Sequence, residues 1–253
     1  MKRIAAALAA FALVALAIPA HAGQLVDFAV VSRATGQRLP VYHHEGRLYV
    51  PGTPGERYAV YVANRTAQRV LAVVSVDGIN VITGDTAATG QDGYVLAPGQ
   101  SFEINGWRKN MSEVASFYFT RLPDSYAART DRPANVGVIG VAAFREWQPR
   151  RPRSVPQSRG SADNAAAEAD SPGRPEAGAA RREEKIGTGH GTREQSEVVH
   201  TEFRRATDHP SETLVIHYDT RANLLARGVI PREPRLVEPN PFPAGRFAPD
   251  PRG

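Results

Sequence analysis

The stretch Val70-Leu-Ala-Val-Val-Ser-Val-Asp-Gly78 says most about how this chain folds. Its first seven residues are apolar at almost every position, so a strand built from them has two faces that must be covered. Such a strand lies inside a sheet, between two layers. The Asp77-Gly78 pair that follows is a strong signal for a two-residue hairpin turn. The stretch therefore predicts a central strand that ends in a tight turn.

The residues on both sides of this stretch continue the same pattern. β-Branched and aromatic residues are frequent across residues 24–147, and turn signals recur about every eight to twelve residues. In one segment Tyr58, Val60 and Val62 share one face, as in a strand with a single face in the core. We expect an all-β fold, a β-sandwich of the Ig-like or jelly-roll type. The expected strands cover 25–32, 39–43, 47–50, 56–63, 69–76, 80–82, 93–96, 101–106, 113–120 and 136–146.

The first 22 residues have the order of a secretory signal peptide. Lys2 and Arg3 precede an apolar run that is too short to span a bilayer, and Ala20-His21-Ala22 forms an A-x-A cleavage site. We expect cleavage after Ala22, no transmembrane segment in the mature protein, and a periplasmic or secreted location.

The remaining chain is expected to fall into four parts. A β-sandwich domain covers 23–147, and a disordered linker rich in Pro, Ala and Arg covers 148–185 because it has too few apolar residues to form a core. A second structured block covers 186–230. A Pro-rich tail that favours extended conformations covers 231–253.

The composition excludes several classes of function. The chain has no cysteine, which excludes thiol catalysis, thiolate metal sites and a lipidated cysteine anchor. The formal net charge is +5, and it falls to +3 when Lys2 and Arg3 leave with the signal peptide. This small excess gives no reason to expect nucleic acid as a partner.

The C-terminal block is expected to form a β-hairpin followed by a short helix. Residues 198–203 and 213–218 resemble two strands, and residues 219–228 resemble a helix with Asp219 or Thr220 as its N-cap and Gly228 after its last turn. A lone hairpin with one short helix is only marginally stable. We therefore expect the block to dock on the sandwich, by adding strands to a sheet edge, and the seam to be a candidate pocket.

The glycine-rich stretch Ile186-Gly-Thr-Gly-His-Gly-Thr-Arg-Glu194 has a composition found in phosphate-binding loops. A P-loop would need a Lys and a helix directly after the glycines, and a dinucleotide fingerprint would need a preceding strand in a βαβ unit. We interpret the glycines as a tight bend through which the chain leaves the linker and enters the C-terminal hairpin. His190 and Arg193 remain candidate binding residues.

Other side chains could also carry binding or chemistry. His200 and His217 could approach one another across the expected hairpin, although half-buried polar residues on strands are the more common case. Trp107 and Arg108, with Lys109, could form an aromatic and cationic surface near Tyr118, although aromatic residues are more common in a core. Three carboxylates beside glycines are interpreted as turn residues rather than calcium ligands. They are Asp77, Asp85 and Asp92.

Residues 69–120 and the two C-terminal stretches IGTGHGTRE and TLVIHYDTRANLLARGVIP resemble a family of exported proteobacterial proteins. The resemblance covers about two thirds of the mature chain and does not include the linker. It implies a Gram-negative envelope or secreted location. The family has no established activity, so the resemblance assigns no catalytic residue.

These observations favour a non-enzymatic binding or interaction protein of the bacterial envelope, with no cofactor and no metal. Its partner would be another envelope protein, or a polysaccharide attracted by the basic cluster at residues 149–153. The alternative is a hydrolase, metal-dependent or not, that uses His190, His200 and His217 with a carboxylate.

Overall fold

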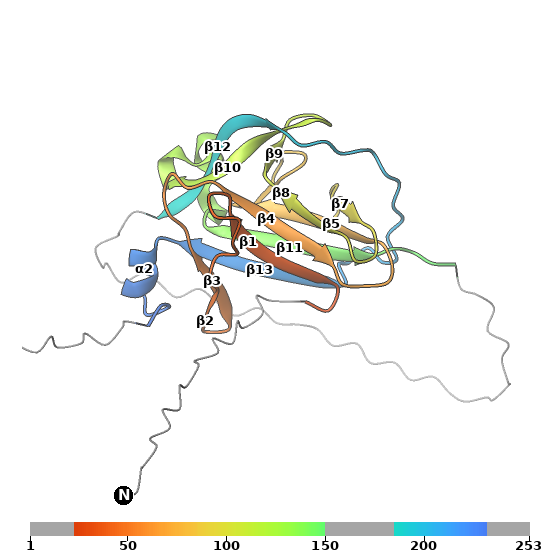
Figure 1. Ribbon diagram of the computed structural model, residues 1–253, viewed down its shortest axis with the longest axis horizontal. Coiled ribbons are helices and arrows are strands. Elements are labelled where there is room, and N and C mark those ends of the chain that lie inside the picture. Colours follow the sequence, from red (N-terminus) through yellow and green to blue (C-terminus); the bar gives the residue numbers. More distant parts are fainter. Residues whose placement is uncertain (1–22, 150–184, 232–253) are drawn as a thin grey trace, which may run out of the picture.

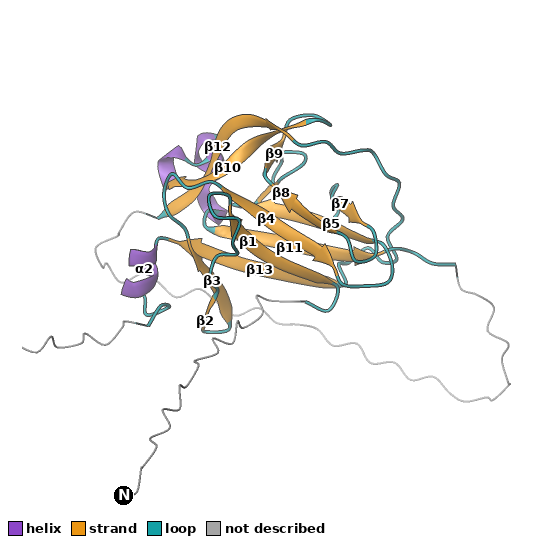
Figure 2. Ribbon diagram, viewed as in Figure 1, coloured by secondary structure: helices purple, strands orange, loops and turns teal. Residues whose placement is uncertain are grey.

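The computed structural model describes residues 23–149 and 185–231. The expected signal peptide, almost all of the expected linker and the Pro-rich tail lie outside the described residues. The described chain consists of strands in three sheets with a few short helices (Figure 1 and Figure 2), so the predicted all-β class is confirmed. No helix in these ranges is long and apolar enough to cross a membrane.

The largest sheet contains the strand that the sequence placed at the centre. Its strands run in the order β2-β3-β13-β11-β5-β6, and β7 also pairs with β5. They are β2 (Tyr42–His44), β3 (Arg47–Pro51), β5 (Val70–Val76), β6 (Ile79–Asn80), β7 (Tyr94–Leu96), β11 (Val138–Arg145) and β13 (Glu212–Asp219). β5 lies between β11 and the two short strands, so the prediction of an interior strand is confirmed.

Alternate residues of β5 face two different apolar layers. Val70 and Val74 belong to the main core, whereas Leu71 and Val73 belong to a second cluster on the other face of the sheet. The turn after β5 is the predicted hairpin turn, because Asp77 and the next residue both have positive φ, 53° and 73°. Positive φ at both central positions is the signature of a type I′ turn.

Two smaller sheets complete the fold. One has the order β1-β4-β8 and the other the order β12-β10-β9. Their strands are β1 (Val26–Ser32), β4 (Tyr58–Asn64), β8 (Ser101–Ile104), β9 (Gly106–Arg108), β10 (Glu113–Arg121) and β12 (Ile186–Gln195). The helical segments are η1 (Leu122–Asp124), α1 (Tyr126–Arg129), η2 (Pro133–Asn135) and α2 (Arg221–Ala226). Phe28, Tyr58 and Phe117 from these sheets and Val74 from the large sheet share one buried core.

The predicted C-terminal hairpin is wrong. Residues 198–203 form no strand, and β12 and β13 lie in different sheets. β12 pairs with β10, as expected for a strand added to an edge, but β13 lies between β11 and β3 and is parallel to β3. Residues 198–203 resembled a strand, but no described strand pairs with them, and Val199 is 84% exposed.

The glycine-rich stretch is also a strand rather than the expected tight bend, since all of Ile186–Glu194 lies within β12. Its glycines allow close approach instead of a bend. A Cβ atom on Gly187 would lie 2.6 Å from Cβ of Ser125, and one on Gly189 would lie 2.2 Å from the Tyr118 ring. Neighbouring side chains fill the space on the face of β12 that carries its glycines, so these positions cannot carry a side chain of their own.

The short helix after β13 is confirmed. Thr220 is the N-cap of α2, and its hydroxyl oxygen accepts a hydrogen bond of 3.0 Å from the backbone N–H of Asn223. Gly228 follows the helix with a φ of 72°, the left-handed conformation usual after a helix C-terminus. The helix and the residues after it pack on Tyr49 of β3.

Candidate functional site

One cavity lies under a long connection between β12 and β13. We call residues 196–205 the strap, because this segment passes over the edge of the large sheet beside β7 (Figure 1). The space between the strap and the sheet, which we call the strap cleft, has a volume of about 1070 Å³. The C-terminal block therefore does form a pocket with the strands that precede the linker.

Hydrogen bonds fix the strap at both ends. At its start, the backbone N–H groups of Ser196 and Val198 donate to carbonyl oxygens of the β9–β10 loop at 2.8 and 2.9 Å. At its end, the carbonyl of Arg204 accepts from the N–H of Trp147 at 2.8 Å, and the Arg205 guanidinium donates to the carbonyl of Gln91 at 2.6 Å. Within the described parts of the chain, residues 199–203 take part in no backbone–backbone hydrogen bond. The middle of the strap is thus held only by its two ends and by side-chain contacts.

Arginine side chains that lie over aromatic rings strengthen the attachment at the end of the strap. The guanidinium carbon of Arg205 lies 4.4 Å from the centre of the Phe144 ring, and that of Arg204 lies 4.1 Å from the Trp147 ring. Arg69, in an ion pair with Glu146, lies 6.0 Å from the ring of Phe203. These cation–π contacts help to hold the strap against the large sheet.

The strap cleft has apolar walls on both faces of β7. Leu71, Val95 and Phe203 belong to the cluster on the outer face of the large sheet. Tyr94 and Phe102 pack against the main core on the other face, with their ring centres 5.3 Å apart. The cleft therefore extends around the edge of β7 rather than over one face.

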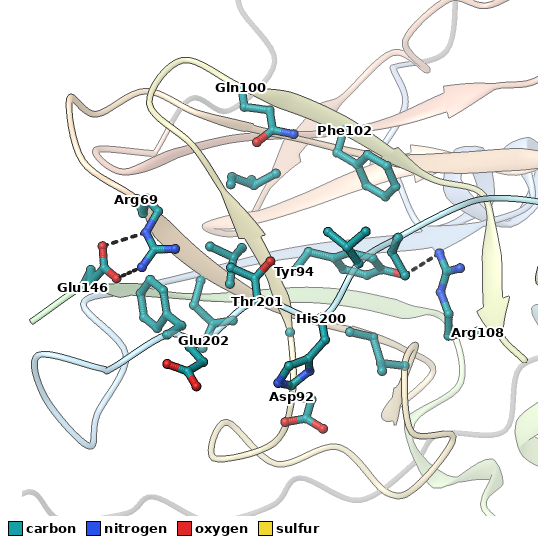
Figure 3. Close-up of a pocket in the computed structure, with 18 of the residues that line it drawn as sticks. Arg69, Asp92, Tyr94, Gln100, Phe102, Arg108, Glu146, His200, Thr201 and Glu202 are labelled. Atoms are coloured by element: carbon teal, nitrogen blue, oxygen red, sulfur yellow. Dashed lines mark hydrogen bonds and ion pairs between the residues drawn. The ribbon is translucent and has the colours of Figure 1, made fainter. Parts of the chain in front are cut away.

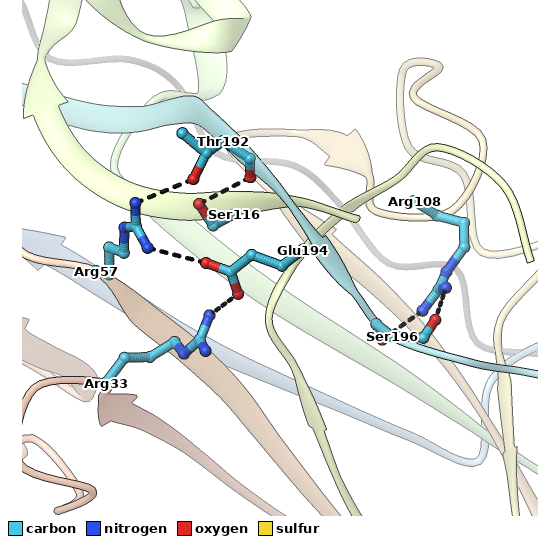
Figure 4. A network of polar contacts seen from close by, with 7 residues as sticks. All are labelled: Arg33, Arg57, Arg108, Ser116, Thr192, Glu194 and Ser196. Carbon is cyan, nitrogen blue, oxygen red and sulfur yellow. Dashed lines mark hydrogen bonds and ion pairs between the residues drawn. The ribbon is translucent and has the colours of Figure 1, made fainter. Parts of the chain in front are cut away.

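Arg108 is the main polar group at one end of the cleft (Figure 3). Its guanidinium donates to the carbonyl and the hydroxyl of Ser196, which also ties the strap to β9 (Figure 4). A further contact of 3.4 Å joins the guanidinium to the hydroxyl of Tyr94. Burial raises the pKa of Tyr94, and the nearby Arg108 opposes that rise. The Nε atom of Arg108 is buried and has no hydrogen-bond partner.

A second polar network holds the last part of β12. The carboxylate of Glu194 accepts from Arg33 and, at 3.0 Å, from Arg57 (Figure 4). Arg57 also donates to the hydroxyl of Thr192 at 3.0 Å, and the Thr192 carbonyl accepts from Ser116 at 3.2 Å. This network fixes the place where β12 ends and the strap begins.

Of the predicted binding residues, Arg108 and His200 line the strap cleft. Trp107 does not form a surface: it is buried, packs edge-on against Phe117, and its Nε1–H donates to the carbonyl of Gly189 at 3.3 Å. Its alternative interpretation as a core residue is therefore correct.

His190 and Arg193 lie on β12, outside the cleft. The Nε2 atom of His190 is 3.3 Å from Nζ of Lys109, and the ring is 5.4 Å from that of Tyr126. Burial, together with the charges of Lys109, Arg129 and Arg193, lowers the pKa of His190. Arg193 itself forms an ion pair of 3.2 Å with Glu113.

The structure does not bring His200 and His217 together, because the hairpin that would have paired them does not exist. His217 on β13 packs against Tyr49 with ring centres 5.4 Å apart, and burial lowers its pKa, as do the charges of Arg47, Arg227 and Lys185. Across 23–149 and 185–231, no three His, Asp or Glu side chains are grouped so that they could hold a metal ion.

A buried polar network at the junction of the sheets was missed by the sequence analysis. The carboxyl group of Asp77 accepts from Tyr218 Oη at 2.5 Å, from Thr188 N at 2.8 Å and from Gly137 N at 2.9 Å. The Thr188 hydroxyl also lies 2.6 Å from Tyr58 Oη and 2.7 Å from Tyr218 Oη. Asp77 is a turn residue, as predicted, but no sequence pattern showed that its side chain points inward.

This network predicts an unusual pH dependence of stability. Burial raises the pKa of Asp77 in the folded state. A carboxyl group with a raised pKa contributes stability that is complete below its unfolded pKa of about 3.9 and is lost as the pH rises through the folded pKa. We expect the stability advantage of the wild type over Asp77→Asn to shrink as the pH rises from about 4 to about 7. Urea unfolding of both proteins across this range checks it, and an advantage that grows with pH would contradict it.

No protein-family model, curated protein or solved structure matches this chain.

Proposed function

We propose that this chain is an exported interaction protein of the bacterial envelope that binds an extended peptide segment of a partner protein in the strap cleft. The leader-like N-terminus supports the export, and the shape and lining of the cleft support the ligand class.

The observation that carries the proposal is a pair of backbone segments that lack a partner strand, on two sides of one cleft. Among the described strands β7 pairs only with β5, so its other edge has no strand beside it. The middle of the strap, residues 199–203, has no regular secondary structure and makes no backbone–backbone hydrogen bond to another described residue. Free edges of this kind accept an added strand, and main-chain hydrogen bonds then supply affinity. A ligand strand that lies along the five residues of this middle part, at about 3.3 Å per residue, would be about four to six residues long.

The walls of the cleft suit the side chains of an extended segment. Successive side chains of a strand point to opposite faces. The ligand side chains on one face of the bound strand would contact Leu71 and Val95, and those on the opposite face would contact Tyr94 and Phe102. Arg108 at one end, with an unpaired buried Nε, favours a carbonyl or carboxylate of the ligand at that end. We therefore expect selected peptides to be apolar at alternating positions.

The absence of cysteine allows a direct binding test. A single cysteine in place of His200, labelled with an environment-sensitive fluorophore, reports on the cleft. The same label in place of the exposed His209 serves as the control, since His209 lies beyond the strap. Peptides selected from a random library on the wild-type protein should change the fluorescence of the first protein and not of the second. Selected binders that change only the label at position 209 would place the site elsewhere.

Two matched valine variants test the apolar wall. Val95→Glu buries a carboxylate in the cleft wall, which costs more than 1.4 kcal/mol, so we expect at least about a tenfold loss of peptide affinity. Val215→Glu changes a valine of β13 that is 39% exposed and does not line the cleft, so affinity should not change. Calorimetry with one selected peptide measures both. An equal affinity of the two variants would contradict the proposal.

The alternative hydrolase function requires His190, His200 and His217 to act together. In the described structure they contact Lys109, line the strap cleft and pack on Tyr49, respectively. No observation therefore favours this alternative over peptide binding.

A further inference from the structure

The carboxylate of Glu212 is hydrogen-bonded by the backbone of the first described residues of the chain. Its oxygens accept hydrogen bonds from three consecutive backbone N–H groups, those of Gln24 at 2.5 Å, Leu25 at 2.9 Å and Val26 at 3.1 Å. The N–H of Gly23 donates a hydrogen bond of 2.8 Å to the carbonyl of Val26. Glu212 is the first residue of β13, so this contact joins the start of β1 to the start of a central strand of the large sheet.

Gly23 lies directly against this carboxylate. A Cβ atom on Gly23 would be 2.4 Å from Oε1 and 2.5 Å from Oε2 of Glu212, so only glycine fits here without displacing the carboxylate. The nitrogen of Gly23 is bonded to the Cα atom from which such a Cβ would project, and in the uncleaved chain its N–H donates to the Val26 carbonyl. The ion pairs of the described residues do not include Glu212. The carboxylate thus has main-chain donors but no cation.

The sequence places the expected cleavage site at the peptide bond that precedes this glycine. Ala20-His21-Ala22 ends at the Ala22–Gly23 bond. A leader peptidase that hydrolyses this bond consumes one water, leaves a carboxylate on Ala22, and converts the amide nitrogen of Gly23 into an α-ammonium group. The only new charge of the mature protein then arises beside Glu212.

We propose that Glu212 is a receptor for the mature N-terminus: removal of the leader after Ala22 creates an ion pair between the Gly23 α-ammonium and the Glu212 carboxylate, which ties β1 to β13. Before cleavage the nitrogen of Gly23 is a neutral amide, so the contact between the two strands is weaker. Processing thereby stabilises the protein after export. The inference rests on the export part of the proposed function and not on peptide binding.

The first experiment locates the processed end. Expression of the full chain in a Gram-negative host, followed by intact-mass analysis of the envelope fraction, should give a protein that begins at Gly23. A protein that begins at any other residue, or keeps its leader, overturns the processing step.

The second experiment tests the ion pair without using export. The protein beginning at Gly23 is released from a fusion by a site-specific protease and compared with a protein that retains His21 and Ala22. We expect the Gly23 protein to melt about 0.5–4 °C higher, the shift that a partly exposed ion pair gives in a domain of this size. In the Glu212→Gln background the difference between the two ends should disappear, whereas in the Glu197→Gln background, which changes a carboxylate of the strap, it should remain. Equal melting temperatures of the two ends in the wild type, or a difference that survives Glu212→Gln, would overturn the ion pair.

Discussion

Replacing Asp77 by alanine is expected to lower the free energy of unfolding by about 3–5 kcal/mol, the largest effect of any single substitution considered for this chain. The substitution removes the acceptor for Tyr218 Oη, Thr188 N and Gly137 N. Thr188 and Tyr218 are 0% and 2% exposed, so water does not replace the lost acceptor. A buried donor without a partner costs about 1–3 kcal/mol, and three donors are affected.

The position of Asp77 explains why the effect is global. Its hydrogen-bond partners come from β12, from β13 and from the loop before β11. The hydroxyl of Thr188 also hydrogen-bonds to Tyr58 of β4. Loss of the carboxyl group therefore loosens all three sheets together rather than one turn. Urea unfolding followed by circular dichroism measures the change. Asp85→Ala is the matched control, because Asp85 is an exposed aspartate beside a glycine and its substitution should change stability by less than about 0.5 kcal/mol.

The short-range signals in the sequence were sufficient for much of the fold. The two-faced apolar pattern of β5 predicted an interior strand, and the Asp77-Gly78 pair predicted its turn. Thr220 and Gly228 marked the two ends of α2. Each of these features depends on residues that are close in sequence, where steric preference and capping act directly.

The features that the sequence analysis missed depend on contacts between distant residues. β12 has no apolar alternation, and it forms a strand because β10 lies beside it and supplies Tyr118 above its glycines. Residues 198–203 resemble a strand in sequence, but they pair with no described strand and form most of the strap. The candidate site could be predicted only in part: Arg108 and His200 were singled out as binding residues, but the cleft that contains them depends on where the strap crosses β7.

Gly187→Ala is expected to destabilise the protein by about 1–3 kcal/mol, because the added methyl group overfills a packed site. Its Cβ would lie 2.6 Å from Cβ of Ser125 and 2.7 Å from Cγ1 of Val136. Neither atom is the free end of a flexible side chain. Ser125 is fully buried and is held in place as the N-cap of α1, where its hydroxyl accepts from Ala128 N at 3.1 Å and donates to the Leu122 carbonyl at 2.7 Å. The cap and the helix must therefore shift with it.

The control for this substitution is Gly90→Ala. A Cβ atom there meets only the guanidinium of Arg205, at 4.0 Å, so we expect no loss, or a gain of about 0.4–1 kcal/mol from the smaller entropy of the unfolded chain. The pair of variants separates two roles for the glycines of β12. Gly187 does not have positive φ, so if it served only to make the backbone flexible, alanine would be tolerated as well as at position 90. A loss at 187 alone, measured by urea unfolding, identifies close packing between β12 and α1 as the reason that the strand carries glycine.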